Sequence, residues 1–167
     1  MSEDNGNGKG NGNGDYKIIK GIVICKNTGE YLVDLILDAN INPILLSSFV
    51  SALSFFGKEN LGKIEEIDVK GLDVEMIVVA KYDLILVTIM DKDFLNGKMR
   101  DEAEKLLDIF YSCYQEEIGK CIDIVKFEEF QKVLASQVQD YIHQMNTQQD
   151  IGDFGFFTQT IRKMRGV

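Results

Sequence analysis

The first apolar residues of the chain follow the pattern of a β-hairpin. Residues 17–26 are a run of mostly β-branched and other apolar side chains, and the turn sequence Asn27-Thr28-Gly29 closes this run. From Tyr31 to Leu37, apolar and more polar side chains alternate, which is typical of a strand with one buried face. Two such strands separated by a short turn predict an antiparallel hairpin.

A helix is predicted to follow the hairpin and to run to about Phe56. Asn42 precedes Pro43, the only proline of the chain, and proline is favoured in the first helical turn, where its missing N–H costs nothing. Apolar residues then recur at helical spacing on one face, namely Leu45, Phe49, Ala52, Leu53 and Phe56. Leu46 and Val50 widen this face, so we expect the sheet or a partner to cover most of the helix.

Three more strands are predicted between residues 63 and 90. The segments 63–69, 72–80 and 84–90 are rich in Ile, Val and Leu, and connections of only two and three residues join them. A parallel crossover needs about a dozen residues, so these strands are expected to form an antiparallel meander. Consecutive apolar residues within them indicate at least partial cover on both faces of the sheet.

Two helices are predicted after the sheet. The first begins near Met99, and the second follows a break near Gly119. The second helix repeats apolar residues at steps of three and four from Phe127 to Met145, which is a narrow stripe that packs on one neighbour. The predicted fold is therefore α+β, a five-stranded antiparallel sheet with helices on both faces in the order ββαβββαα.

Composition divides the chain into three parts. Residues 1–15 are rich in Gly and Asn and lack core side chains, which predicts a disordered tail. Residues 16–145 hold the predicted elements and are expected to form one domain. Residues 146–167 form a C-terminal tail with aromatic and basic side chains. In this tail Phe154, Phe156 and Phe157 either pack back on the domain or bind a partner.

The charge and the cysteines argue against several classes of protein. A net charge of −9 and a pI near 4.6 disfavour a nucleic-acid surface or a basic membrane-binding face, because both need clustered Lys and Arg. No stretch reaches the roughly 18 apolar residues of a membrane span, and the N-terminus lacks the apolar core of a secretory signal. Cys25, Cys113 and Cys121 lack CxxC spacing and are interpreted as buried thiols in a reducing compartment, so we expect a cytoplasmic protein.

Apparent catalytic motifs are incomplete. Residues 57–64 contain the two glycines and the lysine of a P-loop, but Ile64 replaces the hydroxyl residue that holds magnesium, and the segment closes a helix instead of opening one. Gly57 and Gly62 are interpreted as a helix C-cap and a turn. Asp153-Phe154-Gly155 matches the metal-binding tripeptide of protein kinases, but the other kinase motifs are missing.

The remaining polar residues give no stronger indication of catalysis. His143 is the only histidine and has no Cys or Ser close in sequence, so it is interpreted as a surface or capping histidine. Acidic groups occur on one predicted strand and one predicted helix, and both are interpreted as solvated faces: Glu65, Glu66 and Asp68, and Glu102, Glu104 and Asp108. We therefore predict no enzyme activity, no catalytic residue, no cofactor and no metal site.

The order of elements from Ile18 to about Met145 resembles a longin-type domain. The resemblance lies in the opening hairpin, which begins Gly21-Ile22-Val23-Ile24-Cys25, in the long helix after it, and in the three-stranded meander before two helices. The closest rival is the Roadblock fold, which resembles a circularly permuted longin and usually begins with a helix that residues 1–15 cannot form. The composition, rich in Ile, Lys and Glu, suits an archaeal or low-GC organism.

This resemblance implies a non-enzymatic interaction platform. Its partner is expected to be a small GTPase or another longin- or Roadblock-type subunit, in a homo- or heterodimer of a membrane-trafficking-like system, held near membranes only through partners. Longin and Roadblock domains use a sheet edge and the helix beside it. The implied interface is Leu45, Phe49, Leu53 and Phe56 on the helix and Ile67 and Val69 on the edge strand, with Phe154, Phe156 and Phe157 in the tail.

Other interpretations stay open. The six helix and strand residues of the implied interface could instead pack on their own sheet, as apolar residues at these periods usually do. A Roadblock-type GTPase regulator is the nearest functional alternative. A PAS- or profilin-like sensor that encloses a small ligand between helix and sheet is the other.

Overall fold

The computed structural model describes residues 18–62, 64, 66–71, 73–92, 97–120 and 123–146, without the side chains of residues 97, 98, 141 and 144–146. The predicted N-terminal tail, Cys121, and Phe154, Phe156 and Phe157 of the predicted C-terminal tail lie outside these residues. The strands and helices are β1 (Ile19–Lys26), β2 (Tyr31–Ile36), α1 (Pro43–Asn60), β3 (Glu66–Lys70), β4 (Val74–Lys81), β5 (Leu84–Asp91), α2 (Gly97–Ile118), the short 3₁₀ helix η1 (Ile124–Phe127) and α3 (Glu128–Asn146).

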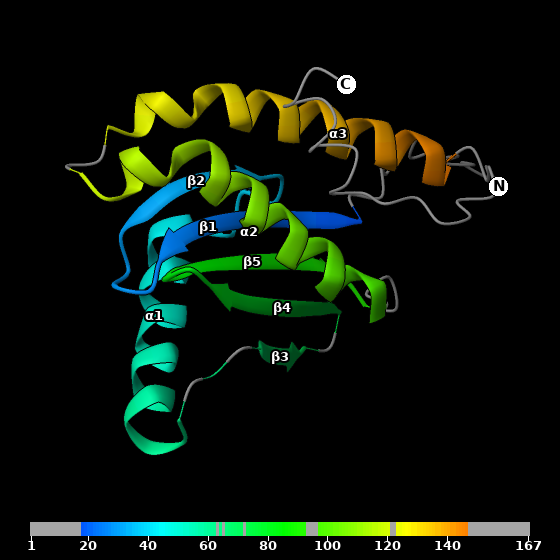
Figure 1. The fold of residues 1–167 in the computed structure, drawn as a ribbon. Coiled ribbons are helices and arrows are strands. Elements are labelled where there is room, and N and C mark those ends of the chain that lie inside the picture. The colour runs from blue at the N-terminus through cyan, green and yellow to red at the C-terminus, as the bar shows by residue number, and fades with distance from the viewer. Residues whose placement is uncertain are drawn as a thin grey trace, which may run out of the picture.

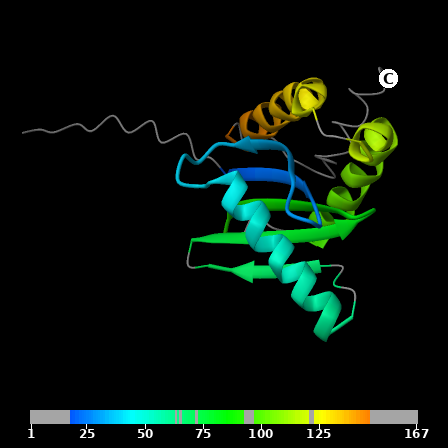
Figure 2. The same ribbon diagram turned by 90° about the vertical axis from the view of Figure 1, so that its left-hand side faces the viewer.

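The strands form one five-stranded antiparallel sheet in the order β2-β1-β5-β4-β3. Pairing of β1 with β5 joins the first hairpin to the meander (Figure 1). The single helix α1 lies on one face of the sheet, and α2 and α3 lie on the other (Figure 2). The predicted α+β class, element order and two-sided cover of the sheet are confirmed.

Alternation along the central strand β5 explains why both faces are buried. Leu84, Leu86 and Met90 belong to the core cluster under α2 and α3. Ile85 and Val87 belong to the smaller cluster under α1. Successive strand residues point to opposite faces, so a strand covered on both sides reads as an uninterrupted apolar run.

Aromatic side chains hold α2 and α3 together over the sheet. Phe110 of α2 lies with its ring centroid 5.3 Å from that of Phe127 and 4.9 Å from that of Phe130. All three rings are buried. Such tilted and edge-on pairs add about 0.5–1.5 kcal/mol each beyond the burial of their area.

Helix α1 begins as predicted and ends later than predicted. The Asn42 side chain accepts hydrogen bonds from the backbone N–H groups of Ile44 and Leu45 at 3.0 and 3.1 Å, which confirms the N-cap. The prediction that Gly57 caps the C-terminus is wrong, because α1 continues to Asn60 and Gly57 is buried inside it. Gly62, with φ of 89°, follows the last turn, and this backbone conformation favours glycine after a helix.

Candidate interaction surface

Small side chains form the face of α1 that lies on the sheet. The buried residues of α1 are Ser47, Val50, Ser51 and Gly57. The Ser51 hydroxyl donates a hydrogen bond to the backbone carbonyl of Lys26 at 3.2 Å, which ties one flank of α1 to the end of β1. The Ser47 hydroxyl donates to the carbonyl of Pro43 at 2.7 Å within the helix. These side chains let α1 approach the sheet closely while their polar groups stay satisfied.

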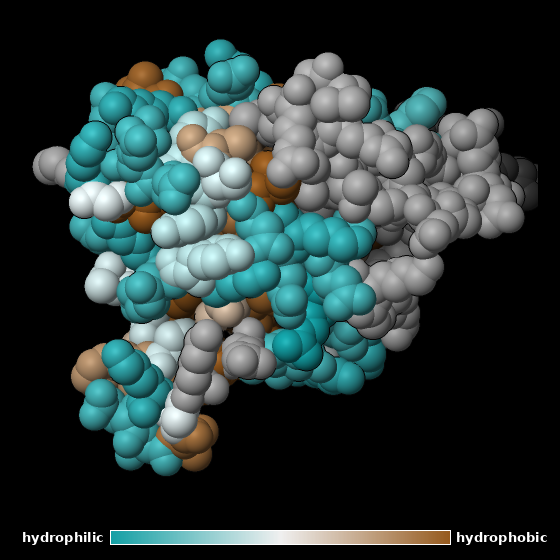
Figure 3. Space-filling view, viewed as in Figure 1, coloured by the Kyte–Doolittle hydropathy of each residue, from teal (hydrophilic) through white to brown (hydrophobic). Residues whose placement is uncertain are grey.

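Large apolar side chains of α1 point away from the sheet. The exposed ones are Ile44 (65%), Leu45 (69%), Phe49 (51%), Phe55 (68%) and Phe56 (57%). Apolar side chains are visible on the projecting end of α1, among hydrophilic ones (Figure 3). A water-exposed helix normally turns its apolar stripe inward, so α1 has the reverse arrangement. Contiguous exposed apolar surface of this kind marks interaction sites.

Helix α1 has the predicted apolar face, but only the residues at the edge of this face pack into the core. Four of the predicted interface residues lie on it, and we call them the α1 stripe: Leu45, Phe49, Leu53 and Phe56. Leu53 is half-buried, whereas the other three are exposed. Ser51, which faces the end of β1, lies on the opposite flank of the helix, because each residue advances by about 100°. The α1 stripe therefore lies on the side of the helix that faces away from the β1–β2 turn.

Strand β3 forms an open edge of the sheet. Among the described residues it pairs only with β4, and its Ile67 and Val69 lie opposite Val78 and Met76. Val78 and Met76 belong to the core cluster under α1, so Ile67 and Val69 share the α1 face. Ile67 is half-buried and Val69 is 39% exposed. The structure thus places the α1 stripe and the two β3 residues on the same face of the sheet.

The opposite edge, β2, is protected. The Gln131 side chain of α3 donates a hydrogen bond to the backbone carbonyl of Asp34 at 2.8 Å, and the Tyr31 hydroxyl donates to the Asp34 carboxylate at 2.8 Å. The helical segment around Phe127 also packs beside β2. An uncovered edge strand is a template for another strand, and cover by a helix removes that option. The contrast between the two edges favours β3 as the edge that meets a partner.

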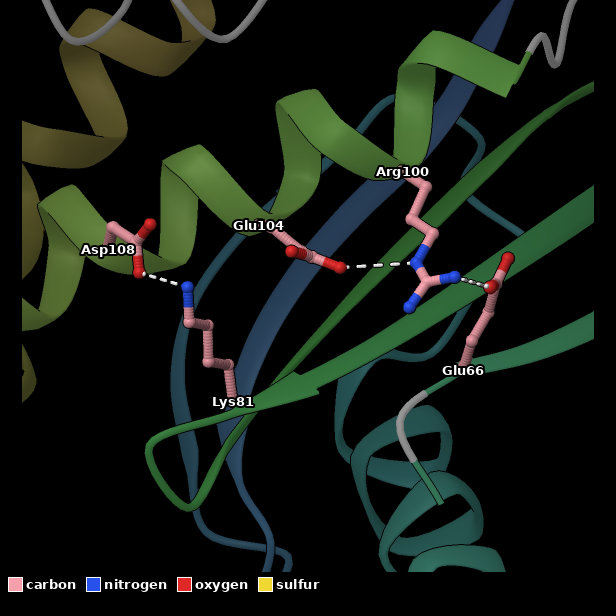
Figure 4. Close-up of polar contacts among 5 residues, drawn as sticks. All are labelled: Glu66, Lys81, Arg100, Glu104 and Asp108. Carbon is pink, nitrogen blue, oxygen red and sulfur yellow. Dashed lines mark hydrogen bonds and ion pairs between the residues drawn. The ribbon is translucent and has the colours of Figure 1, made fainter. Parts of the chain in front are cut away.

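Ion pairs connect β3 and β4 to α2 on the other face of the sheet (Figure 4). The Arg100 guanidinium lies 2.9 Å from the Glu66 carboxylate of β3 and 3.1 Å from that of Glu104. Lys81 lies 2.6 Å from Asp108. Burial raises the pKa of Asp108, but hydrogen bonds from Lys81 and Tyr82 outweigh this and lower it. The prediction that these carboxylates are simply solvated misses their cationic partners, because contacts between distant elements leave no local pattern.

Candidate chemical groups are scattered. Cys25 is buried as predicted, and burial raises the pKa of its thiol to about 11. The same prediction is wrong for Cys113, which is exposed on α2. His143 is exposed near the end of α3. Within the described part of the chain, no group of three or more His, Cys, Asp or Glu side chains is arranged to hold a metal ion.

Described residues also line at least two hollows on the surface. A groove of about 380 Å³ lies between the second half of α1 and the β4–β5 turn, lined by Ser54, Lys58 and Asp83 among others. A smaller one of about 160 Å³ lies beside η1, next to Tyr31. None of the helices in the described ranges is long and apolar enough to cross a membrane.

Comparison with known proteins finds similarity only to solved structures. No protein-family model matches the sequence, and no curated protein matches it either. The chain is similar to the Roadblock/LC7 domain from Streptomyces avermitilis, with a TM-score of 0.49, 11% identity, and cover of 59% of this chain and 86% of that one. It is also similar to Myxococcus xanthus MglB, with a TM-score of 0.47, 18% identity, and cover of 58% and 80%.

A third similar structure is the gliding protein MglB from Thermus thermophilus, with a TM-score of 0.44, 16% identity, and cover of 52% of this chain and 70% of that one. These matches are consistent with the longin/Roadblock resemblance predicted from the order of elements. At such identities they concern the fold alone.

Proposed function

We propose that this chain is a non-enzymatic protein-interaction platform that binds through the α1 stripe and the open edge of β3. The observation that carries the proposal is the exposure of Leu45, Phe49 and Phe56 on one side of a helix whose sheet-facing side is built from two serines, a valine and a glycine. Apolar burial contributes about 25 cal/mol per Å². Burial of these three side chains by a partner therefore makes a large favourable contribution to the free energy of binding.

The helix cannot cover its own stripe by turning on the sheet. Rotation would bring Phe49 or Phe56 to the position where Ser47, Ser51 and Gly57 now fit. Interiors are packed at crystal-like density, and inserting large rings where small groups fit forces the elements apart. The arrangement of small residues inside and large apolar residues outside is therefore consistent with a face that meets another chain.

The class of partner is inferred from the order of the strands and helices. Its resemblance to longin and Roadblock domains implies a small GTPase or another longin- or Roadblock-type subunit as the partner, with this chain as regulator or scaffold in a trafficking-like system. Phe154, Phe156 and Phe157 stay a predicted additional contact. A PAS- or profilin-like sensor needs a pocket enclosed between helix and sheet. The groove at Ser54 lies between α1 and the β4–β5 turn and is partly open to solvent, so it does not enclose a ligand, which supports the platform over the sensor.

Capture of small GTPases from the same organism, loaded with GDP or with a GTP analogue, tests this function. The double variant Phe49→Ser/Phe56→Ser removes both aromatic side chains of the α1 stripe. The matched control is Ile124→Ser/Val125→Ser, which removes apolar side chains of similar exposure, 52% and 60%, from η1. We expect the wild-type and control chains to bind and the stripe variant to lose binding. Absence of binding in both nucleotide states contradicts the GTPase role, and equal binding by all chains contradicts the surface.

A further inference from the structure

The β1–β2 and β4–β5 turns meet at one end of the sheet, beside α1 (Figure 1). The backbone N–H of Asn27 donates to the Asp83 carbonyl at 2.8 Å, and the Asn27 side-chain amide donates to the Asp83 carboxylate at 3.0 Å. The ring of Tyr82 stacks on that of Tyr111 of α2, with ring centroids 4.5 Å apart. Contacts with two neighbouring elements therefore hold the β4–β5 turn in one position.

Two residues of the β4–β5 turn have a backbone conformation that favours glycine. The φ angle is 57° at Tyr82 and 59° at Asp83. A Cβ atom disfavours this left-handed region, and two-residue hairpin turns of this kind usually contain Asn or Gly. Side chains that are kept at unfavourable backbone angles are typical of functional sites. At Asp83 the retained side chain lines the groove between α1 and the turn.

This groove, which we call the turn groove, offers one positive charge to a ligand. Lys58 and Lys81 both line it. The Lys81 ammonium is bound 2.6 Å from Asp108 on the other face of the sheet (Figure 4). Lys58 is exposed and has no ion-pair partner among the described residues. The Asp83 carboxylate already accepts a hydrogen bond from Asn27, so Lys58 is the charged group of the groove that can bind an acid.

A hydroxyl group lies one helical turn from Lys58. Ser47, Ser48 and Ser51 each donate to a backbone carbonyl, at 2.7, 3.0 and 3.2 Å. Ser54 lines the turn groove, and within the described part of the chain its hydroxyl has no hydrogen-bond partner. Residues four apart lie on the same face of a helix. A carboxylate can accept hydrogen bonds from the Ser54 hydroxyl and the Lys58 ammonium together.

Apolar groups lie beside these donors. Ile64 and Ala80 are half-buried in the lining of the turn groove. Phe55 is 68% exposed and lies three residues before Lys58, on the same side of the helix. Ser54 and Phe56 are about 200° apart around α1, so the groove and the α1 stripe lie on opposite sides of the helix.

We infer that the turn groove binds an extended segment of a partner protein in which an acidic side chain stands next to an apolar one. The acid binds Lys58 and Ser54. The apolar side chain packs on Ile64 and Ala80, and a further residue of the segment covers Phe55. The site is separate from the α1 stripe and the β3 edge, so the inference goes beyond the proposed function.

The shape and the charge of the groove favour such a segment. A groove of about 380 Å³ that is partly open to solvent can hold one or two side chains while the rest of the ligand stays in water. The chain carries a net charge of −9, which repels acidic ligands in general. An acid is therefore attracted only near a local positive charge, and Asp83 on the opposite wall directs it to the Lys58 side.

Selection from a library of short random peptides on the wild-type chain tests the inference. We expect the enriched sequences to carry Asp or Glu next to an apolar residue. Fluorescence anisotropy with one labelled peptide then measures affinity. Lys58→Glu is expected to weaken binding roughly tenfold at low salt, because it replaces an attraction with a repulsion. Phe55→Ser is expected to weaken it about threefold. Lys132→Glu makes the same charge change at an exposed position on α3 and is expected to have no effect.

Exchange of the two charges gives a second test. A peptide whose acid is replaced by lysine is expected to bind Lys58→Glu more tightly than it binds the wild-type chain. Addition of the original peptide to the wild-type chain is expected to shift the amide NMR signals of Ser54, Lys58 and residues 80–84. Urea unfolding of each variant shows whether a loss of binding comes from a loss of the fold.

The outcomes separate this inference from the proposed function. Phe49→Ser/Phe56→Ser is expected to keep the peptide, whether or not it still binds a GTPase. Failure to enrich any peptide, enrichment of peptides without an acid, or equal affinity of the wild-type chain and Lys58→Glu overturns the inference and leaves the platform standing. Loss of the peptide by the folded stripe variant also overturns it, because the peptide then binds the α1 stripe.

Discussion

Gly57 lies directly against Ile64. A Cβ atom placed on Gly57 is 1.9 Å from Ile64 Cδ1 and 2.3 Å from Ile64 Cγ1, which is far inside van der Waals contact. This contact holds the last turn of α1 against the segment that leads into β3. The two parts of the proposed interface, the α1 stripe and the β3 edge, are therefore positioned relative to each other by one residue without a side chain.

Gly57→Ala is expected to lower the free energy of unfolding by about 1–2 kcal/mol, although alanine favours a helix by about 1 kcal/mol over glycine. Urea unfolding measures the change. Ile64→Ala in the same chain is expected to recover part of the loss, because it removes the atoms that clash. Gly119→Ala is the control, since its added Cβ meets no atom closer than 3.6 Å. An unchanged or higher stability of Gly57→Ala contradicts the close contact.

Thr88→Val is expected to stabilise the chain by about 1 kcal/mol. Thr88 is 1% exposed on β5, and its hydroxyl has no hydrogen-bond partner among the described residues. A buried polar group without a partner costs roughly 1–3 kcal/mol, and valine keeps the shape without the hydroxyl. Thr88→Ser keeps the hydroxyl and loses a methyl group, so it is expected to destabilise. A destabilised valine variant indicates that the hydroxyl is bonded.

Phe49→Ala is expected to change the free energy of unfolding of the isolated chain by about 0.5 kcal/mol or less, because its side chain is 51% exposed. Phe110→Ala, a fully buried ring, is expected to cost about 3–5 kcal/mol. The comparison is made by urea unfolding at a concentration low enough to keep the chain monomeric. Equal losses for the two substitutions mean that Phe49 belongs to the core.

Stability is expected to fall as the pH rises from about 9 towards 11, in part because of Cys25. Burial raises the pKa of this thiol above its ordinary value of 9.0 to about 11. In this window the unfolded chain loses the thiol proton while the folded chain keeps it, so rising pH favours unfolding. Cys25→Ala is expected to show a smaller decrease over the same window. An identical slope for the two chains contradicts the raised pKa.

The elements of the fold could be predicted because their signals are local. The Asn27-Thr28-Gly29 turn, the short links between β3, β4 and β5, and the Asn42-Pro43 helix start each lie within a few residues. The turn and the short links predict which consecutive strands pair in antiparallel fashion. Pairing of β1 with β5 could not be predicted, because no local pattern joins segments so far apart.

The orientation of α1 could not be predicted from its periodicity. The apolar face that includes Phe49 is the stronger pattern, yet the buried face consists of Ser47, Val50, Ser51 and Gly57. A face of small residues gives little hydropathy signal and is chosen by close packing on the sheet. The ion pair between Arg100 and Glu66 could not be predicted either, because it depends on how α2 crosses β3.

Sedimentation equilibrium of the wild-type chain and of Phe49→Ser/Phe56→Ser at micromolar concentration tests the central claim most directly. The α1 stripe and the β3 edge as one interface predict a wild-type mass near twice 18.9 kDa. They predict a mass of 18.9 kDa for the stripe variant, with an unchanged circular dichroism spectrum. A wild-type chain that sediments at 18.9 kDa throughout contradicts self-association through this surface, and a stripe variant with the wild-type mass contradicts the α1 stripe as its interface.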